Sequence, residues 1–464
     1  MIKSELAGKK IHIIGIGGTG MSSIGRVLLE MGAVVSGSDR SESIYTEELR
    51  KAGAKVIIGQ KADNINHPDI VIYSSAIHPD NPELQSALEK GIPSEKRLTF
   101  LSTLLEGRDI IAISGTHGKT TTTSMAAWVL QQLQTGAGYI IGGISKNLGT
   151  NASAGTGSLF VIEADEYDHM FWGLSPKYAV VTRIEHDHPD CYPTKESYFD
   201  AFRTFLKKTI KGGTILLNAD DPNQNDLTTD QYFQSGNVRV FHFGINNKAD
   251  FSATDVKLDD KGCGEFTFTA GGVEPVRVHL SIPGEHNIYN ALVVMVLCCL
   301  ENLDLNKAAE ALHRFSGDER RFDKIAEWNH IEIIDDYAHH PTEIKATLAA
   351  AKAAYAGRKI WALWQPHTFS RTKLLLNDFN QSFNDADAVI VTNIFAAREI
   401  QQDFGFEDLK KAFIHPNTYF AETNAEAVKI LKENLQPGDV VITLSAGDAN
   451  QIGPAALECM KEKK

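Results

Sequence analysis

Short apolar runs and helical periodicity alternate through the first hundred residues. Residues 11–14 form an apolar run that predicts a strand, and apolar side chains from Met21 to Met31 then recur at helical spacing. Residues 34–39 and 70–73 predict two further strands. The order of strand, glycine turn, helix and strand is typical of a doubly wound α/β unit.

A second unit of the same kind begins near residue 109. Residues 110–113 predict a strand that leads into a glycine-rich turn, and Met125, Trp128 and Val129 predict the helix after it. Segments long enough for helices separate the next strand candidates, as a largely parallel sheet requires. These candidates are residues 159–162, 178–182 and 213–217.

Two other patterns complete the chain. Residues 250–282 show short alternating runs, which predict a small antiparallel sheet appended to the second unit. A third α/β pattern follows, with strands predicted at residues 331–334, 360–363, 388–391 and 440–444. We therefore predict an α/β fold of three domains: a Rossmann-like domain over residues 1–104, a central domain over 105–319 with a mostly parallel sheet plus the small antiparallel sheet, and a Rossmann-like domain over 320–464.

Composition narrows the choice of partners. The 464 residues include 46 Lys plus Arg and 59 Asp plus Glu, a formal net charge of −13, which argues against a nucleic acid or an anionic membrane as partner. No apolar run reaches the roughly 18 residues that span a bilayer, and the first ten residues lack the apolar core of a signal peptide. We expect a cytosolic protein, a monomer or a dimer, whose five cysteines are free thiols.

The first glycine-rich turn suits a diphosphate. It contains Gly15, Gly17, Gly18, Thr19 and Gly20 between a predicted strand and a predicted helix, so backbone amides and the helix N-terminus can approach negative charge. Asp39 ends the second strand, where an acceptor for a ribose hydroxyl is expected. The pattern alone fits NAD, another nucleotide diphosphate, or a tight turn without a ligand.

The second glycine-rich turn carries more chemistry. It consists of Gly115, Thr116, His117, Gly118, Lys119, Thr120 and Thr121. Backbone amides, an ammonium and a hydroxyl at a helix start can hold β and γ phosphates and Mg²⁺, which makes the central domain a P-loop-type ATPase domain. Ile113 stands where a full Walker pattern has glycine, so a solvated turn is the alternative. Carboxylates at 163–166 and a polar cluster at 185–190 follow the next strands, at the sheet edge where this fold binds ligands.

Six motifs in order carry a family resemblance. They are GTHGKTT at 115–121, EADE at 163–166, DHPD at 187–190, HNIYNA at 286–291, RRF at 320–322 and DDYAHHP at 335–341. This order resembles the Mur ligases, the ATP-dependent amino-acid ligases of peptidoglycan synthesis, over almost the whole chain. The glycine-rich opening, the segment from Ser74 to Ile77, QPH at 365–367 and SRT at 370–372 are most similar to the alanine-adding branch.

The resemblance implies an activity and its reactants. An enzyme of that branch joins L-alanine to the lactyl carboxylate of UDP-N-acetylmuramate through an acyl phosphate, using ATP and Mg²⁺, with two ions expected. The N-terminal domain then holds the UDP end, the central domain ATP, and the C-terminal domain the amino acid. The sequence does not decide whether L-alanine, glycine or L-serine is the preferred acceptor.

The resemblance also assigns residues to roles. Catalysis falls to Lys119, Glu163, His188, Arg321 and His339, and the metal ligands are Thr120, Glu163 and His188. ATP binding falls to the loop Gly115, Thr116, His117, Gly118, Lys119, Thr120 and Thr121, and to His286, Asn287, Asn290, Arg321 and Asp336. The substrate residues are Gly15, Gly17, Gly18, Thr19, Gly20, Asp39, Ser74, Ser75, Ala76, Tyr337, His339, His367 and Arg371.

Three positions qualify the assignment within the family. Arg203 stands near where related ligases carry a carbamylated lysine, which favours the alanine branch unless Arg203 is an ordinary exposed helix residue. Thr368 replaces an arginine usual in that branch, and Tyr167 is typical of the recycling ligase that attaches a tripeptide to the same sugar nucleotide. Tripeptide addition is therefore the alternative. An NAD-dependent oxidoreductase and a non-catalytic nucleotide-binding protein are weaker ones.

Overall fold

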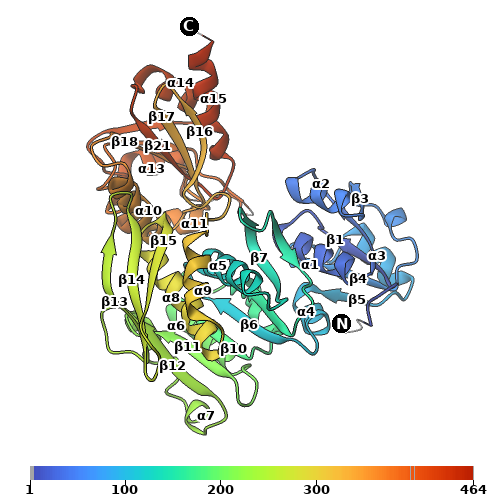
Figure 1. The fold of residues 1–464 in the computed structure, drawn as a ribbon. Helices are drawn as coiled ribbons and strands as arrows, with labels where there is room; N and C mark the ends of the chain where they lie inside the picture. The colour runs from blue at the N-terminus through green and yellow to red at the C-terminus, as the bar shows by residue number, and fades with distance from the viewer. Residues whose placement is uncertain (1–4, 398, 402, 463–464) are drawn as a thin grey trace.

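The computed structural model describes residues 5–397, 399–401 and 403–462, which fold around three sheets (Figure 1). The N-terminal sheet, blue in the figure, is parallel throughout and has the strand order β3-β2-β1-β4-β5. Its elements are β1 (Lys10–Ile14), α1 (Thr19–Glu30), β2 (Val34–Asp39), α2 (Ile44–Lys51), β3 (Lys55–Ile58), β4 (Ile70–Tyr73), α3 (Pro82–Glu89), β5 (Ser94–Lys96) and α4 (Arg97–Leu104). The predicted Rossmann-like unit is confirmed.

The central sheet has ten strands in the order β15-β14-β13-β12-β11-β10-β6-β9-β7-β8. Its first elements are β6 (Asp109–Ser114), α5 (Lys119–Gln132), β7 (Gly138–Ser145), β8 (Thr150–Ser153), β9 (Leu159–Glu163), β10 (Tyr178–Val181), α6 (Lys195–Leu206) and β11 (Thr214–Asn218). The later ones are α7 (Gln231–Gln234), β12 (Arg239–Gly244), β13 (Phe251–Leu258), β14 (Cys263–Ala270), β15 (Val276–Pro283), α8 (His286–Leu300) and α9 (Leu305–His313). The mostly parallel sheet is confirmed.

The predicted antiparallel strands extend this sheet. β13, β14 and β15 pair antiparallel with one another, and β13 joins the main sheet by parallel pairing with β12. At the opposite edge β7 and β8 form an antiparallel pair that the sequence pattern did not predict. Three neighbouring strands of the sheet, β10, β6 and β9, are parallel, so their carboxyl ends meet at one edge.

The C-terminal sheet has the order β16-β17-β21-β18-β19-β20 and is parallel except for β16. Its elements are β16 (Asp323–Trp328), β17 (Ile331–Asp336), α10 (Pro341–Ala354), β18 (Ile360–Trp364), α11 (Phe369–Leu374), α12 (Leu376–Asn380), β19 (Ala388–Thr392), α13 (Phe406–Ala412), β20 (Thr418–Ala421), α14 (Asn424–Asn434), β21 (Val440–Leu444) and α15 (Ile452–Lys461). Completely buried residues of β18 and β19 explain their continuous apolar runs.

The three units meet around one region. A continuous apolar cluster joins α1 and α4 of the N-terminal unit to one face of the central sheet, and the C-terminal unit lies over the edge that carries the carboxyl ends of β6 and β9 (Figure 1). The predicted boundaries at 104/105 and 319/320 fall in the connections between α4 and β6 and between α9 and β16. In the described part of the chain the five cysteines are free, and no helix is both long and apolar enough to cross a bilayer.

Candidate active site

The loop before α5 is shaped by two glycines in left-handed backbone conformations. Gly118 is the N-cap of α5 with φ +80°, and Gly115 has φ +134°. A Cβ atom on Gly115 would lie 2.2 Å from the Thr182 hydroxyl oxygen, so only glycine fits this turn. The loop therefore presents its backbone at the N-terminus of a helix, the position that favours a phosphate.

Lys119, the first residue of α5, points back over this loop. Its ammonium donates to the carbonyl oxygens of Gly115 and Thr116 and lies 3.0 Å from the Glu166 carboxylate, which is only 1% exposed. Burial lowers the pKa of Lys119, but Glu166, Asp165 and Glu163 outweigh burial and leave the pKa raised. Lys119 is therefore a permanent positive charge in the loop.

Glu163, the last residue of β9, faces the start of α5. The Thr120 hydroxyl donates to one of its oxygens at 3.2 Å, and the backbone amide of Gly142 donates to the other at 2.7 Å. A hydroxyl and a carboxylate at this distance are oxygen ligands of the kind that Mg²⁺ takes. The predicted ligands Thr120 and Glu163 are thus brought together.

His188 lies beside a different carboxylate. Its Nε2 is 3.7 Å from Glu166 and 3.8 Å from Asp187, and its backbone has φ +55°, a strained conformation for a side chain of this size. The structure thus adds Glu166 and Asp187 to the environment of this predicted ligand.

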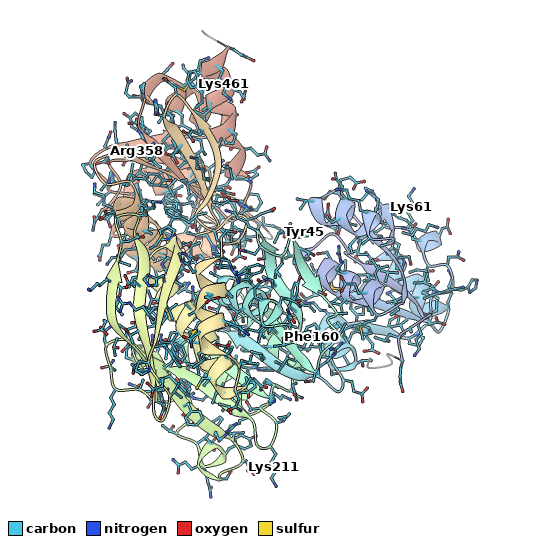
Figure 2. All side chains as sticks on the ribbon, in the orientation of Figure 1. Tyr45, Lys61, Phe160, Lys211, Arg358 and Lys461 are labelled. Atoms are coloured by element: carbon cyan, nitrogen blue, oxygen red, sulfur yellow. The ribbon has the colours of Figure 1, made fainter. Side chains whose placement is uncertain are left out.

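A cavity of about 660 Å³, here named the interdomain cavity, receives residues from all three units. Of the predicted residues it is lined by Thr19, Gly20, Thr116, Gly118, Lys119, Thr120, Glu163, His188, Arg321, Tyr337, His339, His367 and Arg371. Tyr45 of α2 also lines it, and Figure 2 shows this residue on the side of the N-terminal unit that faces the other two. Thr368 and Tyr167, the two departures from the family pattern, lie in its wall.

A second cavity of about 320 Å³, here named the side cavity, lies between the central and C-terminal units. The predicted residues that line it are His117, Gly118, Thr120, Thr121, His286, Asn287, Asn290, Arg321 and Asp336. Gly118, Thr120, Arg321 and Glu343 line both cavities. The two spaces therefore adjoin at the second glycine loop.

The amides of the side cavity already form hydrogen bonds within the chain. Asn290 donates to Asn287 at 3.0 Å and accepts from Thr122 at 2.9 Å, while Asn287 donates to the Pro283 carbonyl at 2.7 Å. Asp336 accepts from two backbone amides at 2.8 and 2.9 Å, and burial raises its pKa to about 6. Their predicted contacts with adenine and ribose stay predictions.

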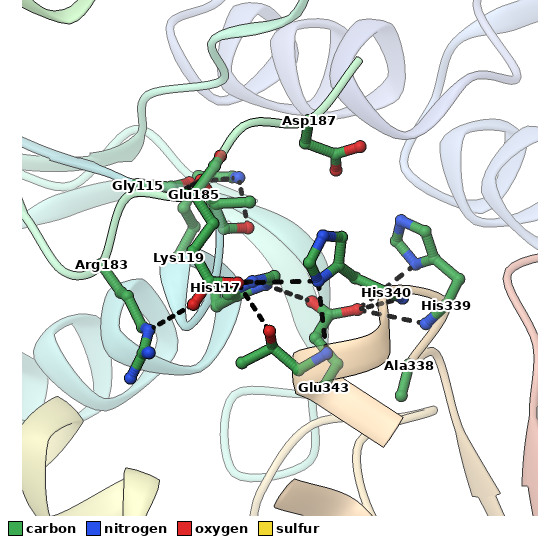
Figure 3. A network of polar contacts seen from close by, with 12 residues as sticks. Gly115, His117, Lys119, Arg183, Glu185, Asp187, Ala338, His339, His340 and Glu343 are labelled. Carbon is green, nitrogen blue, oxygen red and sulfur yellow. Dashed lines mark hydrogen bonds and ion pairs between the residues drawn. The ribbon is translucent and has the colours of Figure 1, made fainter. Parts of the chain in front are cut away.

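His117 joins the central and C-terminal units. Its Nδ1 lies 3.1 Å from Glu343 of α10, and its Nε2 lies 3.3 Å from Glu185, as the dashed lines in Figure 3 show. Burial lowers the pKa of His117, but the two carboxylates raise it to about 9 overall. His117, Glu185 and His340 could by geometry hold a metal ion, but His117 is protonated at neutral pH and the network is already an ion-pair network.

Arg371 forms a second connection between these units. Its Nε donates to Asp187 at 2.9 Å, its Nη2 lies 2.8 Å from the same carboxylate oxygen, and its Nη1 lies 3.1 Å from His367. Burial opposes ionisation of Asp187, but His188 and Arg371 outweigh burial and keep the pKa of Asp187 well below the usual range. Burial lowers the pKa of His339 to about 3 and of His367 to about 4, so both are neutral. The predicted contact of Arg371 with a substrate carboxylate stays a prediction.

Seven of the predicted residues in the N-terminal unit line neither cavity, and Gly115 of the central unit lines neither. The seven are Gly15, Gly17, Gly18, Asp39, Ser74, Ser75 and Ala76. They gather at the carboxyl ends of β1, β2 and β4, where the Gly17 amide donates to Asp39 at 2.8 Å. Of the predicted residues in this unit, Thr19 and Gly20 are the two that line the interdomain cavity.

Several residues of the site had no role from sequence. Glu166, Asp187 and Glu343 contact predicted residues. Glu166 and Asp187 lie inside quoted motifs and Glu343 lies two residues after one, a signal that could have found them. Arg97 and Asp318 lie outside the assigned residues; burial raises the pKa of Asp318 to about 7. Arg203 pairs with Glu196 and Asp200 of its own helix and lines neither cavity, as an ordinary helix residue does.

A phosphate loop that opens on a cavity shared by three α/β units defines a nucleotide-dependent enzyme. Three family descriptions match the chain in order: the Mur ligase family catalytic domain at residues 10–109, the Mur ligase middle domain at 113–298, and the Mur ligase glutamate ligase domain at 320–447. The chain belongs to the Mur ligase family.

Named relatives and solved structures support membership of the same family. A UDP-N-acetylmuramate–L-alanine ligase of Desulforamulus reducens is 41% identical over 98% of each chain, and one of Caldanaerobacter subterraneus is 38% identical over 97% of each. Among solved structures, a UDP-N-acetylmuramate-alanine ligase of Thermotoga maritima is 30% identical with a TM-score of 0.81, covering 98% of this chain and all of its own. A murein peptide ligase of Psychrobacter arcticus is 26% identical with a TM-score of 0.74, covering 98% of this chain and 99% of its own.

Proposed function

We propose that the chain is an ATP-dependent ligase of peptidoglycan synthesis that joins L-alanine to the lactyl carboxylate of UDP-N-acetylmuramate. The observation that carries this proposal is the contact between the two cavities. Gly118 and Thr120 of the phosphate loop line both of them, so a triphosphate in the side cavity would present its γ-phosphate to a substrate in the interdomain cavity. That juxtaposition is what phosphorylation of a carboxylate requires.

In the first step of the reaction the lactyl carboxylate must approach the γ-phosphate, and both groups are negatively charged. A lactyl oxygen attacks the γ-phosphorus and ADP leaves, giving an acyl phosphate; the deprotonated amine of L-alanine then attacks the acyl carbon and phosphate leaves. Lys119 and Arg321, both in the wall of the interdomain cavity, would offset the negative charge that converges on the γ-phosphate. The neutral imidazoles of His339 and His367 line the part contributed by the C-terminal unit, where the amino acid is expected.

The oxygen donors suit Mg²⁺, the usual cofactor of the family. Thr120 and Glu163 would hold one ion, and His188 with Glu163 would hold a second; Glu166, 3.7 Å from His188, is a further candidate ligand. When bound, the ions offset negative charge on the phosphates. The chain itself fixes the donors, because the Gly142 amide orients Glu163 and Arg371 anchors Asp187 next to His188.

The alternative substrate is a tripeptide. Tyr167 favours it because tyrosine at this position is typical of the recycling ligase; its hydroxyl donates to Asp190 at 2.9 Å in the wall of the interdomain cavity. The full-length relatives at 38–41% identity are named for L-alanine, whereas the murein peptide ligase is 26% identical, so tripeptide addition is not favoured.

Phosphate release from ATP tests the proposal. With UDP-N-acetylmuramate present, L-alanine should stimulate release and the tripeptide should not. Glycine and L-serine in the same assay give the order of acceptor preference. Phosphate release that depends on the tripeptide alone would show that the chain has the recycling activity instead. No release with either acceptor would contradict both proposed activities.

A further inference from the structure

His188, the histidine proposed to hold the second ion, has a fixed backbone but a ring without hydrogen bonds. Its amide donates to the Asp187 carboxylate at 2.7 Å, and its carbonyl oxygen accepts from the amides of Cys191 and Tyr192 at 2.9 and 2.8 Å. Across the described residues neither ring nitrogen of His188 takes part in a hydrogen bond, and the Glu166 and Asp187 carboxylates lie 3.7 and 3.8 Å from Nε2. The orientation of the ring therefore depends on its packing.

A free ring is unusual for a metal ligand. A histidine that binds a metal ion through one nitrogen almost always donates from the other nitrogen to a carboxylate, a carbonyl or a water, and this contact fixes the ring. Glu166 at 3.7 Å is beyond hydrogen-bond distance, and it is itself a candidate ligand. Another side chain has to limit the rotation of the His188 ring if the ring is to present a nitrogen to an ion.

Tyr167 packs against this ring. The two ring centroids are 5.1 Å apart and the ring planes are inclined by 66°, close to the edge-to-face arrangement that aromatic pairs prefer. Both residues line the interdomain cavity. The phenol ring therefore occupies one side of the imidazole and limits the positions that the imidazole can take.

The hydroxyl of Tyr167 anchors this contact. It donates to the carboxylate of Asp190 at 2.9 Å, and Asp190 lies two residues beyond His188. Tyr167 directly follows the carboxylate motif at 163–166, and its amide donates to Asp165 of that motif at 3.1 Å. The side chain thus connects the two motifs that supply Glu163 and His188, the residues proposed to share the second ion.

We propose that Tyr167 is a positioning residue for the second ion: its ring and its hydroxyl hold His188 in the orientation in which the imidazole binds the metal. This inference rests on the proposed function, in which His188 and Glu163 hold that ion. It gives a role to one of the two positions at which the chain departs from the pattern of the alanine branch. Tyr167 acts through His188 and not through contact with the acceptor.

Electron paramagnetic resonance of Mn²⁺ measures ion binding without turnover, in the full chain with UDP-N-acetylmuramate and a non-hydrolysable ATP analogue. Tyr167→Ala should weaken binding of the second ion on the order of 10- to 100-fold, the usual effect of removing a group that orients a metal ligand. Tyr167→Phe keeps the ring and loses the hydroxyl, so we expect a loss of about 3- to 10-fold. The ion assigned to Thr120 and Glu163 should bind both variants as it binds the wild type.

Tyr355→Phe is the matched control. The Tyr355 hydroxyl also donates to a carboxylate, that of Glu332 at 3.2 Å, but Tyr355 lines neither cavity. Its removal should change the affinity of neither ion. Comparison with Tyr167→Phe therefore separates the loss of this particular hydroxyl from the loss of any similar hydrogen bond.

A double-mutant cycle tests whether Tyr167 acts through His188. His188→Gln should weaken the second ion, and Tyr167→Ala in that background should have little further effect. Additive losses, or unchanged Mn²⁺ affinity in Tyr167→Ala, overturn the proposal. A raised KM for the acceptor at unchanged Mn²⁺ affinity also overturns it and assigns Tyr167 to the substrate.

Two further outcomes separate this inference from its premises. Equal loss of both ions together with a lower thermal midpoint would indicate a purely structural role for Tyr167 and overturn the inference, as would a wild type that binds a single Mn²⁺ ion. A wild type that binds both ions but releases no phosphate would count against the proposed ligase alone, because ion binding does not depend on turnover.

Discussion

Gly142→Ala is the sharpest probe of the pair formed by Thr120 and Glu163. A Cβ atom on Gly142 would lie 2.4 and 2.5 Å from the two carboxylate oxygens of Glu163, so the carboxylate must retreat by about 1 Å to reach ordinary contact at 3.4 Å. The backbone of Gly142 lies outside the left-handed region, and the three atoms nearest to the added Cβ all belong to the Glu163 carboxylate. The perturbation is therefore directed at the position of that carboxylate.

A misplacement of 1 Å in a reacting site costs about 100-fold in rate. We expect Gly142→Ala to lower phosphate release by that order and to raise the Mg²⁺ concentration for half-maximal activity, with binding of UDP-N-acetylmuramate unchanged. Gly143→Ala is the control, because a Cβ atom there lies 3.4 Å from a Thr120 methyl carbon, an ordinary contact. Wild-type rate and Mg²⁺ dependence in Gly142→Ala, or equal damage in both variants, would refute the reasoning.

Four further substitutions test the rest of the site. Lys119→Ala should reduce phosphate release at least 100-fold and leave UDP-N-acetylmuramate binding in calorimetry nearly unchanged; equal loss of both would contradict the division of labour between units. Arg371→Ala should raise the KM for L-alanine more than that for ATP, and Asp187→Asn, which removes only its partner, separates a substrate contact from a structural one. The pKa of His117, raised to about 9, means that its ion pairs stabilise the fold fully below about pH 6.5 and lose this effect as pH rises through 9. His117→Gln should therefore lower the thermal midpoint at pH 6 and approach the wild type above pH 9.

The elements that sequence predicted best are those whose burial is uniform. β1, β6 and β18 are buried almost completely, so their apolar runs stand out, and each begins within a residue or two of its predicted position. The β7 strand escaped because glycines at 138, 142 and 143 interrupt its apolar pattern. Position 142 requires glycine because the Glu163 carboxylate occupies the space that a Cβ atom would fill.

In the site, too, residues that are neighbours in the sequence could be predicted, whereas contacts between residues far apart in the sequence could not. The phosphate loop could be predicted because its chemistry lies in seven consecutive residues. His117 and Glu343 are 226 residues apart and Asp187 and Arg371 184 apart, and no pattern along the chain relates them. Arg97 was missed for a related reason, since only the fold places its guanidinium against Gly20.

The ion pair of Asp187 with Arg371 links docking of the C-terminal unit to the assembly of the centre. Asp187 directly precedes His188, whose left-handed backbone must be held in place by its surroundings. Arg371 is 4% exposed and comes from the C-terminal unit, so its hydrogen bond and ion pair with Asp187 exist only while that unit covers the sheet edge. Separation of the units would leave Asp187 without its main partner and free His188 to leave the strained conformation. Docking of the C-terminal unit, which we propose brings the amino acid to the acyl group, thus also holds in place the histidine predicted to bind a metal ion.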